Sequence, residues 1–213
     1  MGLGTDELEA LAECVDLINS GRPGSGAAPP GRSAGAGAGA GARAGRADPL
    51  ATRAGVAGFA RRHRVENIAA ARASDAARLR DLRARLDAIA AACEAGLEAA
   101  AIRDLNALLA ETGAVPQIVE HDGRGPHIHV SCATAPLADR IAAHSAMGLA
   151  ALIVAGASSR LRTCASPSCQ SLFVDLSRNH SRRYCDSRTC GNRLHVAAYR
   201  SRRSSATPAQ AAS

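Results

Sequence analysis

The chain has 213 residues and a formal net charge of +7, and arginine occupies all 26 of its basic positions. That length allows one domain with a small appendage or two small domains. Because the sequence has neither a secretory signal pattern nor a charge-free apolar stretch of about 18 residues, we expect a cytoplasmic protein that does not contact membranes.

The N-terminal residues predict one helix followed by a long loop. Residues 6–19 carry apolar side chains at helical spacing and end at Ser20 and Gly21, so we place the first helix of the N-terminal domain within residues 1–20. Residues 21–47 contain only Gly, Ala, Pro, Ser and Arg. Such a segment cannot bury enough apolar surface to offset its ordering entropy, so we predict a flexible loop there.

Residues 48–159 predict a helical domain that carries one β-hairpin. Apolar residues at helical spacing indicate helices at residues 49–70, 74–100, 98–109 and 136–158. Ser74 is expected to cap the second of these helices, and Gly113 to end the third. The clearest apolar stripe belongs to the second helix and consists of Leu79, Leu82, Leu86, Ile89 and Cys93.

Between the last two helices the period changes, and residues 116–132 predict a hairpin around the turn residues 122–125. His127 and His129 alternate on one strand and share a face, which makes a metal or catalytic role conceivable. With a four-residue loop, Glu120 lies opposite His127, and His121 points to the other face. This separation favours an exposed hairpin over a three-histidine site.

No catalytic motif stands out in the chain. It lacks Gly-x-Ser-x-Gly, a phosphate-binding glycine loop and His-Glu-x-x-His. We therefore predict no catalytic residues and no enzyme.

Four cysteines carry the clearest chemical signal. They form two pairs with four residues inside each pair and fifteen between the pairs: Cys164, Cys169, Cys185 and Cys190. This spacing is typical of a tetrahedral structural zinc site. A segment with few large apolar side chains also needs a cross-link such as a bound metal in order to fold. Disulfides or unrelated cysteines are the alternatives, and a reducing cytoplasm disfavours disulfides. We predict one structural Zn²⁺, with His180 and His195 as the nearest substitute ligands.

The module around these cysteines, residues 160–203, also holds the excess positive charge. Its ten arginines and two aspartates give +8, whereas the rest of the chain gives −1. We predict that the module binds nucleic acid through a loop before Cys185 and a helix that begins at Cys190. A solubilising arginine face is the alternative, and residues 204–213 are expected to be a disordered tail. The predicted contacts are Arg178, Arg182, Arg183, Arg188, Asn192, Arg193, Arg200, Arg202 and Arg203.

The sequence of this module resembles a known family. Residues 160–203 are similar to the C-terminal CGNR-type zinc finger of bacterial stress-induced transcription regulators, with Cys-Gly-Asn-Arg at residues 190–193 and LFVDLSRN at residues 172–179. The resemblance implies zinc on the four cysteines and a DNA-binding role. Tyr184 and His195 depart from the family pattern, which commonly has Trp and Lys at these positions.

The resemblance extends upstream, because CVDLIN at residues 14–19 and DPLATRAGVAGFA at residues 48–60 look like the family's N-terminal domain. We expect a mainly α (α+β) fold: a helical N-terminal domain with one β-hairpin, then a small four-cysteine zinc-finger module that ends in a helix. The expected function is transcription regulation, with DNA bound by the finger and the N-terminal domain sensing a small-molecule effector or forming a homodimer. The alternatives are an RNA-binding protein and a protein-interaction module with a purely structural zinc.

Overall fold

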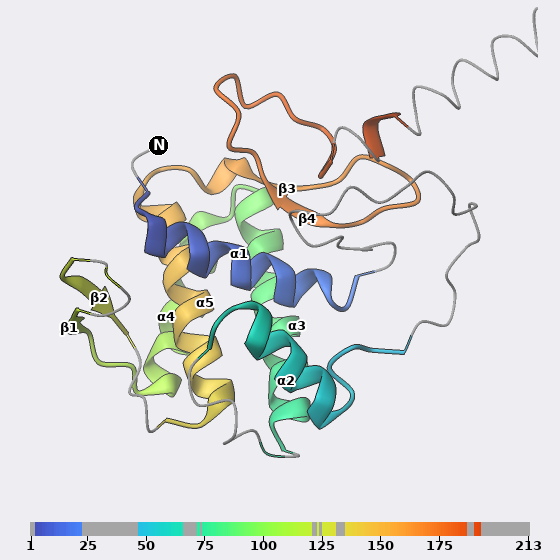
Figure 1. Cartoon of the computed structure of the whole chain (residues 1–213). Coiled ribbons are helices and arrows are strands. Elements are labelled where there is room, and N and C mark those ends of the chain that lie inside the picture. The colour runs from blue at the N-terminus through green and yellow to red at the C-terminus, as the bar shows by residue number, and fades with distance from the viewer. Residues whose placement is uncertain are drawn as a thin grey trace, which may run out of the picture.

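The computed structural model describes residues 3–22, 47–65, 72, 74–120, 123, 125–130, 135–186 and 190–192. Figure 1 shows the helices packed side by side, with one strand pair across the top of the view and the other at the left. This arrangement confirms the predicted mainly α (α+β) class. The elements are α1 (Thr5–Asn19), α2 (Arg53–Arg62), α3 (Asp75–Glu94), α4 (Glu98–Thr112), β1 (Gln117–Val119), β2 (His127–His129), α5 (Leu137–Val154), the 3₁₀ turn η2 (Ser158–Arg160), β3 (Leu161–Thr163) and β4 (Leu172–Val174).

The predicted apolar stripe of α3 lies in the core. All five of its residues are buried, and Leu79 and Leu86 are fully so. Gly113 ends α4 in the left-handed conformation, with φ of +60°, as expected. Among the described helices, α5 is long and apolar enough to cross a membrane, with a mean hydropathy of 1.4, but 67% of it is buried inside the protein. Its apolar side chains pack in the main hydrophobic core of the protein.

Helices α1 and α5 cross at close range. A Cβ added to Gly148 of α5 would lie 2.4 Å from the backbone nitrogen of Leu11 in α1. A side chain cannot fit there, so the crossing depends on glycine at this position. Cys14 and Leu149, on the same two helices, are fully buried.

Helix α2 is shorter than the predicted 49–70. It begins after Thr52, whose hydroxyl oxygen accepts a hydrogen bond from the N–H of Gly55 at 3.1 Å. It ends at Arg62, and the chain then turns through Arg64, which has φ of +53°. Residues 66–70 of the predicted helix lie outside the described residues.

The prediction that Ser74 caps α3 is wrong in its mechanism. Ser74 precedes the helix, but its side chain makes no capping hydrogen bond because its backbone is already in the helical region. The carboxylate of Asp75 instead accepts a hydrogen bond from the N–H of Arg72 at 2.7 Å. At the other end, α3 stops at Glu94 rather than residue 100, because Gly96 takes a left-handed conformation with φ of +74°.

The hairpin forms where predicted, but its register differs by one residue. Val119, not Glu120, pairs with His127, and Ile118 pairs with Ile128. The physical reason is that the observed register sets Ile118 opposite Ile128 as an apolar cross-strand pair, whereas the predicted one would set Ile118 opposite His129. His127 and His129 share a face, with ring centroids 5.0 Å apart, and His121 lies outside the described residues.

The strand pair β3–β4 packs against the helices. Leu161 and Leu172 belong to the main hydrophobic core. The side-chain amide of Asn19, at the end of α1, donates to the carbonyl of Leu172 at 2.9 Å and accepts from its N–H at 2.7 Å. The carboxylate of Glu94, at the end of α3, accepts from the N–H and the hydroxyl of Thr163, both at 2.8 Å. The first strand pair of the cysteine module is therefore fixed to the helical domain.

Candidate metal centre and nucleic-acid surface

The first two cysteines lie on a tight turn between β3 and β4. The N–H of Cys164 donates to the carbonyl of Ser171, and the N–H of Cys169 donates to the carbonyl of Ser166, each at 2.9 Å. These backbone bonds fold the four residues between the cysteines back on themselves. The short spacing in the sequence thus becomes a turn that aims both sulfurs to one side.

A backbone hydrogen bond also holds the second pair. The N–H of Cys190 donates to the carbonyl of Asp186 at 3.1 Å. The two turns are joined directly, because the N–H of Ala165 donates to the carbonyl of Arg183 at 2.9 Å. This bond brings Cys185 and Cys190 against the first pair.

The four sulfurs are arranged to bind one metal ion. All lie within 4.8 Å of one another, and the sulfur of Cys185 lies 3.7 Å from those of Cys169 and Cys190. A tetrahedral zinc site with Zn–S bonds of about 2.3 Å separates its sulfurs by about 3.8 Å. Disulfide sulfurs lie only about 2.05 Å apart, and the four cysteines are free thiols. The donor set and its spacing therefore fit zinc.

The thiols of this cluster do not ionise equally without a cation. Burial opposes ionisation of Cys169, but hydrogen bonds with Ser171 outweigh burial and hold the pKa of Cys169 below its ordinary value. Burial, together with the neighbouring Cys169, raises the pKa of Cys185 far above its ordinary value and that of Cys190 to about 11. The Cys169 thiolate thus opposes ionisation of Cys185 and Cys190, and a divalent cation removes that conflict.

Family comparisons agree with this geometry. The sequence profile of the CGNR zinc finger matches residues 160–203, and that of the family described as "Putative stress-induced transcription regulator" matches residues 11–156, more than half of the chain. The chain belongs to this regulator family. The predicted family and the single zinc ion are thereby confirmed. Cys164, Cys169, Cys185 and Cys190 form the cluster that would hold the ion. Neither family is an enzyme family, and no curated protein matches the chain.

Among the described residues, the apolar cluster at the zinc site of the CGNR finger consists of cysteines and one tyrosine. Tyr184 and Cys185 pack, partly buried, against the buried Cys164, Cys169 and Cys190. Tyr184 therefore acts as a small core residue at the position where the family commonly has Trp.

Asp175 shapes the loop that leads from β4 to the third cysteine. Its carboxylate is fully buried and accepts hydrogen bonds from the N–H and hydroxyl of Ser177, at 2.9 and 2.5 Å, and from the N–H of Arg182 at 2.8 Å. Burial opposes the charge, but these bonds outweigh it and lower the pKa of Asp175 below its ordinary value. The loop is consequently folded around an ionised carboxylate.

Arg160 holds the same loop from its other side. Its guanidinium donates to the carbonyl of Asp175 at 2.9 Å and to that of Ser177 at 3.2 Å, and it contacts the ring of His180. His180, named above as a substitute ligand, is thus engaged with Arg160 and is not part of the sulfur cluster.

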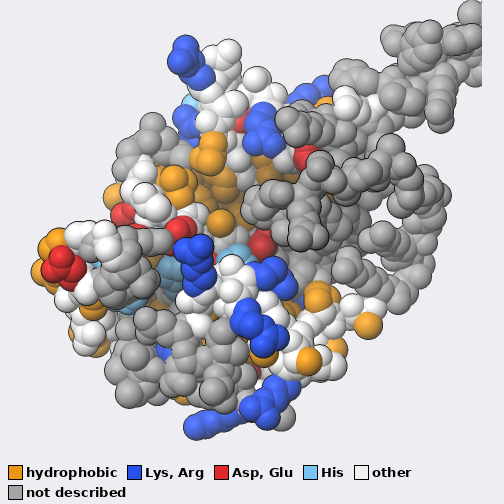
Figure 2. Space-filling view, viewed as in Figure 1, with side chains coloured by type: hydrophobic (Ala, Val, Ile, Leu, Met, Phe, Trp, Pro, Cys, Tyr) orange, Lys and Arg blue, Asp and Glu red, His pale blue; other side chains and the backbone are white. Residues whose placement is uncertain are grey.

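The predicted nucleic-acid contacts fall into three groups. Arg178, Arg183 and Asn192 are exposed, and Figure 2 shows arginine side chains standing out over the finger at the top of the molecule. Arg182 is turned inward: its guanidinium donates to the carbonyl of Cys185 at 2.6 Å and lies 5.4 Å from the ring centroid of Phe173. The third group, Arg188, Arg193, Arg200, Arg202 and Arg203, lies outside the described residues. Of the helix expected to begin at Cys190, only residues 190–192 are described, and these are helical.

Sequence reasoning did not identify the residues that attach the finger to the helices. Arg22 donates to Asp87 on α3 and to the carbonyl of Gln170 in the finger, alongside the bonds from Asn19 and Glu94. No local pattern marks these positions, because their partners lie 65 or more residues away in the sequence. Asp175 could have been found, since an Asp followed two residues later by Ser is typical of a side-chain-stabilised turn.

Proposed function

We propose that this protein is a DNA-binding transcription regulator, in which the CGNR finger contacts the DNA backbone and the helical domain supplies sensing or dimerisation. The observation that carries the proposal is the pair of exposed arginines, Arg178 and Arg183, on a loop fixed by buried groups. Neither side chain makes a hydrogen bond or ion pair with any described residue. Both guanidinium groups are therefore available to phosphate oxygens.

The local charge supports a polyanionic partner. Residues 160–203 carry ten arginines and two aspartates. One of the two, Asp175, is fully buried and hydrogen-bonded inside the loop, so its negative charge faces backbone N–H groups rather than solvent. The finger thus presents a net charge of +8, and the field of such a charge accelerates encounter with nucleic acid.

The rigidity of the loop also favours this role. Zinc holds one end of it at Cys185, and Asp175 and Arg160 hold the other. A pre-ordered loop loses little conformational entropy on binding, so its arginines contribute more to affinity than they would on a free tail. The cytoplasmic location expected for a transcription regulator gives the finger access to DNA.

The deciding experiment compares random duplex DNA, single-stranded DNA and structured RNA by fluorescence anisotropy at about 50 and 200 mM salt, where counterion release is visible. We expect zinc-loaded protein to prefer duplex DNA and to lose affinity steeply as salt rises. A preference for structured RNA would instead support the RNA-binding alternative, and no binding to any of the three would leave the finger a structural or protein-contact element.

A matched set of variants connects binding to the loop. The double variant Arg178→Gln and Arg183→Gln should weaken duplex binding and reduce the slope of log K against log salt by about 0.9 for each phosphate that is no longer neutralised. Its zinc content should not change. Arg61→Gln is the control, because Arg61 is an equally exposed arginine on α2, away from the finger. Equal slopes for the double variant and the control would remove this loop from the interface.

A further inference from the structure

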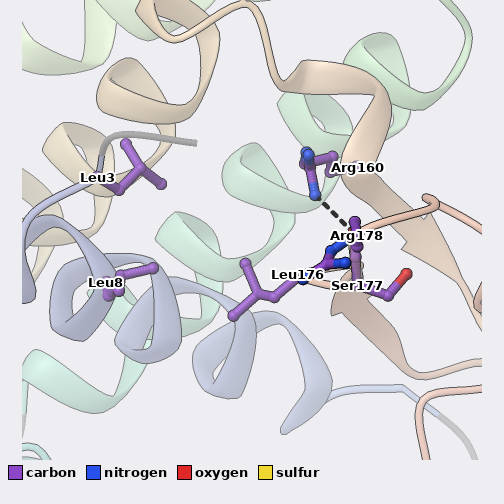
Figure 3. A pocket seen from close by; sticks show the side chains of 6 residues that line it. All are labelled: Leu3, Leu8, Arg160, Leu176, Ser177 and Arg178. Carbon is purple, nitrogen blue, oxygen red and sulfur yellow. Dashed lines mark hydrogen bonds between the residues drawn. The ribbon is translucent and has the colours of Figure 1, made fainter.

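A cavity of about 430 Å³ lies where the start of α1 meets the finger loop that follows β4. Its volume is within the range of about 300–1,000 Å³ typical of small-molecule sites. Figure 3 shows its walls, with Leu3 and Leu8 on one side and the finger loop on the other. The lining residues are Leu3, Leu8, Arg160, Leu176, Ser177 and Arg178.

One wall of the cavity is apolar. Leu176 is 54% exposed although it is a leucine, and its side chain extends toward α1. Leu3 and Leu8 are only partly buried. Three leucines that share one cavity without closing it provide a surface for an apolar group of a ligand.

The finger side of the cavity also carries two cationic groups. The guanidinium of Arg160 donates to two carbonyls and contacts His180. None of these partners is a carboxylate, so its positive charge is not neutralised by them. Arg178 makes no ion pair or hydrogen bond with the described part of the chain. Two guanidinium groups beside an apolar wall match a ligand that is anionic at one end and apolar at the other.

The acidic side chains at the start of α1 are not among the residues that line the cavity. Asp6 and Glu9 act electrostatically on His144 of α5, and the Glu7 carboxylate lies beside Gly4. Leu8 lies two residues from Asp6 and one from Glu9, and residues at these spacings do not share a helix face. The six residues that line the cavity therefore include two arginines and no carboxylate.

We propose that this cavity binds a small amphipathic organic anion, a carboxylate with an apolar chain or ring, as the effector of the regulator. The carboxylate lies against Arg178 and Arg160, and the apolar part against Leu3, Leu8 and Leu176. The regulatory half of this inference rests on the proposed function, since Arg178 would then serve both the effector and the DNA backbone. Effector and DNA compete for that side chain, so each weakens binding of the other by the same factor.

The test begins without nucleic acid. Full-length zinc-loaded protein is titrated with octanoate, below its micelle concentration, and with octan-1-ol as its neutral counterpart, by calorimetry. We expect octanoate to bind about tenfold or more tightly than octan-1-ol, and Arg178→Gln to weaken octanoate by about tenfold or more. Arg183→Gln, on the same loop but outside the cavity, should leave octanoate affinity unchanged. Equal affinity for the acid and the alcohol, or an unchanged Arg178→Gln variant, overturns the proposal.

A second arm measures duplex DNA binding with and without saturating octanoate. We expect octanoate to weaken DNA binding to the wild type and to have no effect on Arg178→Gln. Octanoate binding in a protein that binds no DNA would sustain the cavity as a ligand site while the proposed function fails. DNA binding that octanoate does not alter would overturn the regulatory half of this inference and leave the proposed function intact.

Discussion

The helical domain and the CGNR finger bury different kinds of atoms. The helices bury one continuous cluster that is mostly leucine, isoleucine and alanine, whereas the finger's own cluster consists of Cys164, Cys169 and Cys190 with two partly buried neighbours. Apolar burial stabilises a fold by about 25 cal/mol per Å² in the presence or absence of metal. A thiolate cluster stabilises it only while the cation is bound. The two regions should therefore respond differently to chelation.

The boundary between the part stabilised by apolar burial and the part stabilised by zinc does not fall at residue 160, where the finger begins. Leu161 and Leu172, on β3 and β4, belong to the helical core, and Asn19 and Glu94 hold the same strands. The second cysteine pair, by contrast, contributes to the separate sulfur cluster rather than to that core. The strand pair that carries the first two cysteines of the finger thus belongs to the core of the helical domain.

The largest expected effect comes from loss of the metal. Cys190→Ser should reduce zinc content from one ion per chain to none or nearly none after dialysis, because three thiolates bind more weakly than four. Duplex binding should disappear with it, while the helical far-ultraviolet circular dichroism signal persists. Metal analysis by mass spectrometry and circular dichroism test both statements.

The control for that experiment is Cys93→Ala, which removes a cysteine buried in α3, outside the sulfur cluster. It should lose some stability and keep its zinc. If Cys190→Ser also kept a full zinc ion, the assignment of the second pair to the site would be wrong.

The helical region should be most sensitive at the crossing of α1 and α5. Gly148→Ala places a methyl group 2.4 Å from a backbone nitrogen, and overpacking of this kind costs about 1–3 kcal/mol. We expect a fall of about 2–4 °C in Tm for each kcal/mol lost in a protein of this size. Gly58→Ala is the control, since a Cβ at Gly58 of α2 meets nothing within 4 Å and should stabilise the helix by about 0.5–1 kcal/mol. A Tm for Gly148→Ala at or above the wild-type value would contradict the close crossing.

A smaller effect should appear where the two regions join. Asn19→Ala leaves the N–H and carbonyl of Leu172 without their side-chain partner. Because these groups are partly buried, we expect a loss of about 1–3 kcal/mol in unfolding free energy, and faster hydrogen exchange at the Leu172 amide. Asn106→Ala, at an exposed position of α4, should stay within about 0.5 kcal/mol of the wild type. An unchanged exchange rate at the Leu172 amide would show that Asn19 does not hold the finger to the helical domain.

The smallest effect is a pH dependence confined to the helical region. Burial alone would lower the pKa of His144, but the carboxylate of Glu13, 3.3 Å from its Nδ1, outweighs burial and, with Glu9 and Asp6, raises that pKa. A raised folded-state pKa means that this contribution to stability is fully present below the ordinary value of about 6.5 and is lost as pH rises through the higher folded value. Urea unfolding from about pH 6 to pH 9 should show this decline in the wild type, and His144→Gln should flatten it. A slope that His144→Gln does not alter would assign the decline to another group.

Several local features of the molecule could be read from the sequence because local physics decides them. The spacing of the four cysteines indicated the zinc site, since two turns suffice to bring each pair of sulfurs together. The 3.6-residue period placed Leu79, Leu82 and Leu86 in the core, and glycine in the left-handed region ended α4 at Gly113. The hairpin register was predicted one residue off, because the cross-strand pairing of Ile118 with Ile128 outweighed the turn pattern.

The chain by itself therefore determined the metal, the helical class and the excess of positive charge on the finger. Only the tertiary structure decided which arginines face solvent: Arg182 turns inward to the Cys185 carbonyl, while Arg178 borders a cavity shared with α1. It also decided that the finger is anchored to the helices through Asn19, whose partner lies 153 residues further along the chain. The physical reason is that contacts over such separations arise from the packing of whole elements, and no short window of sequence contains both partners.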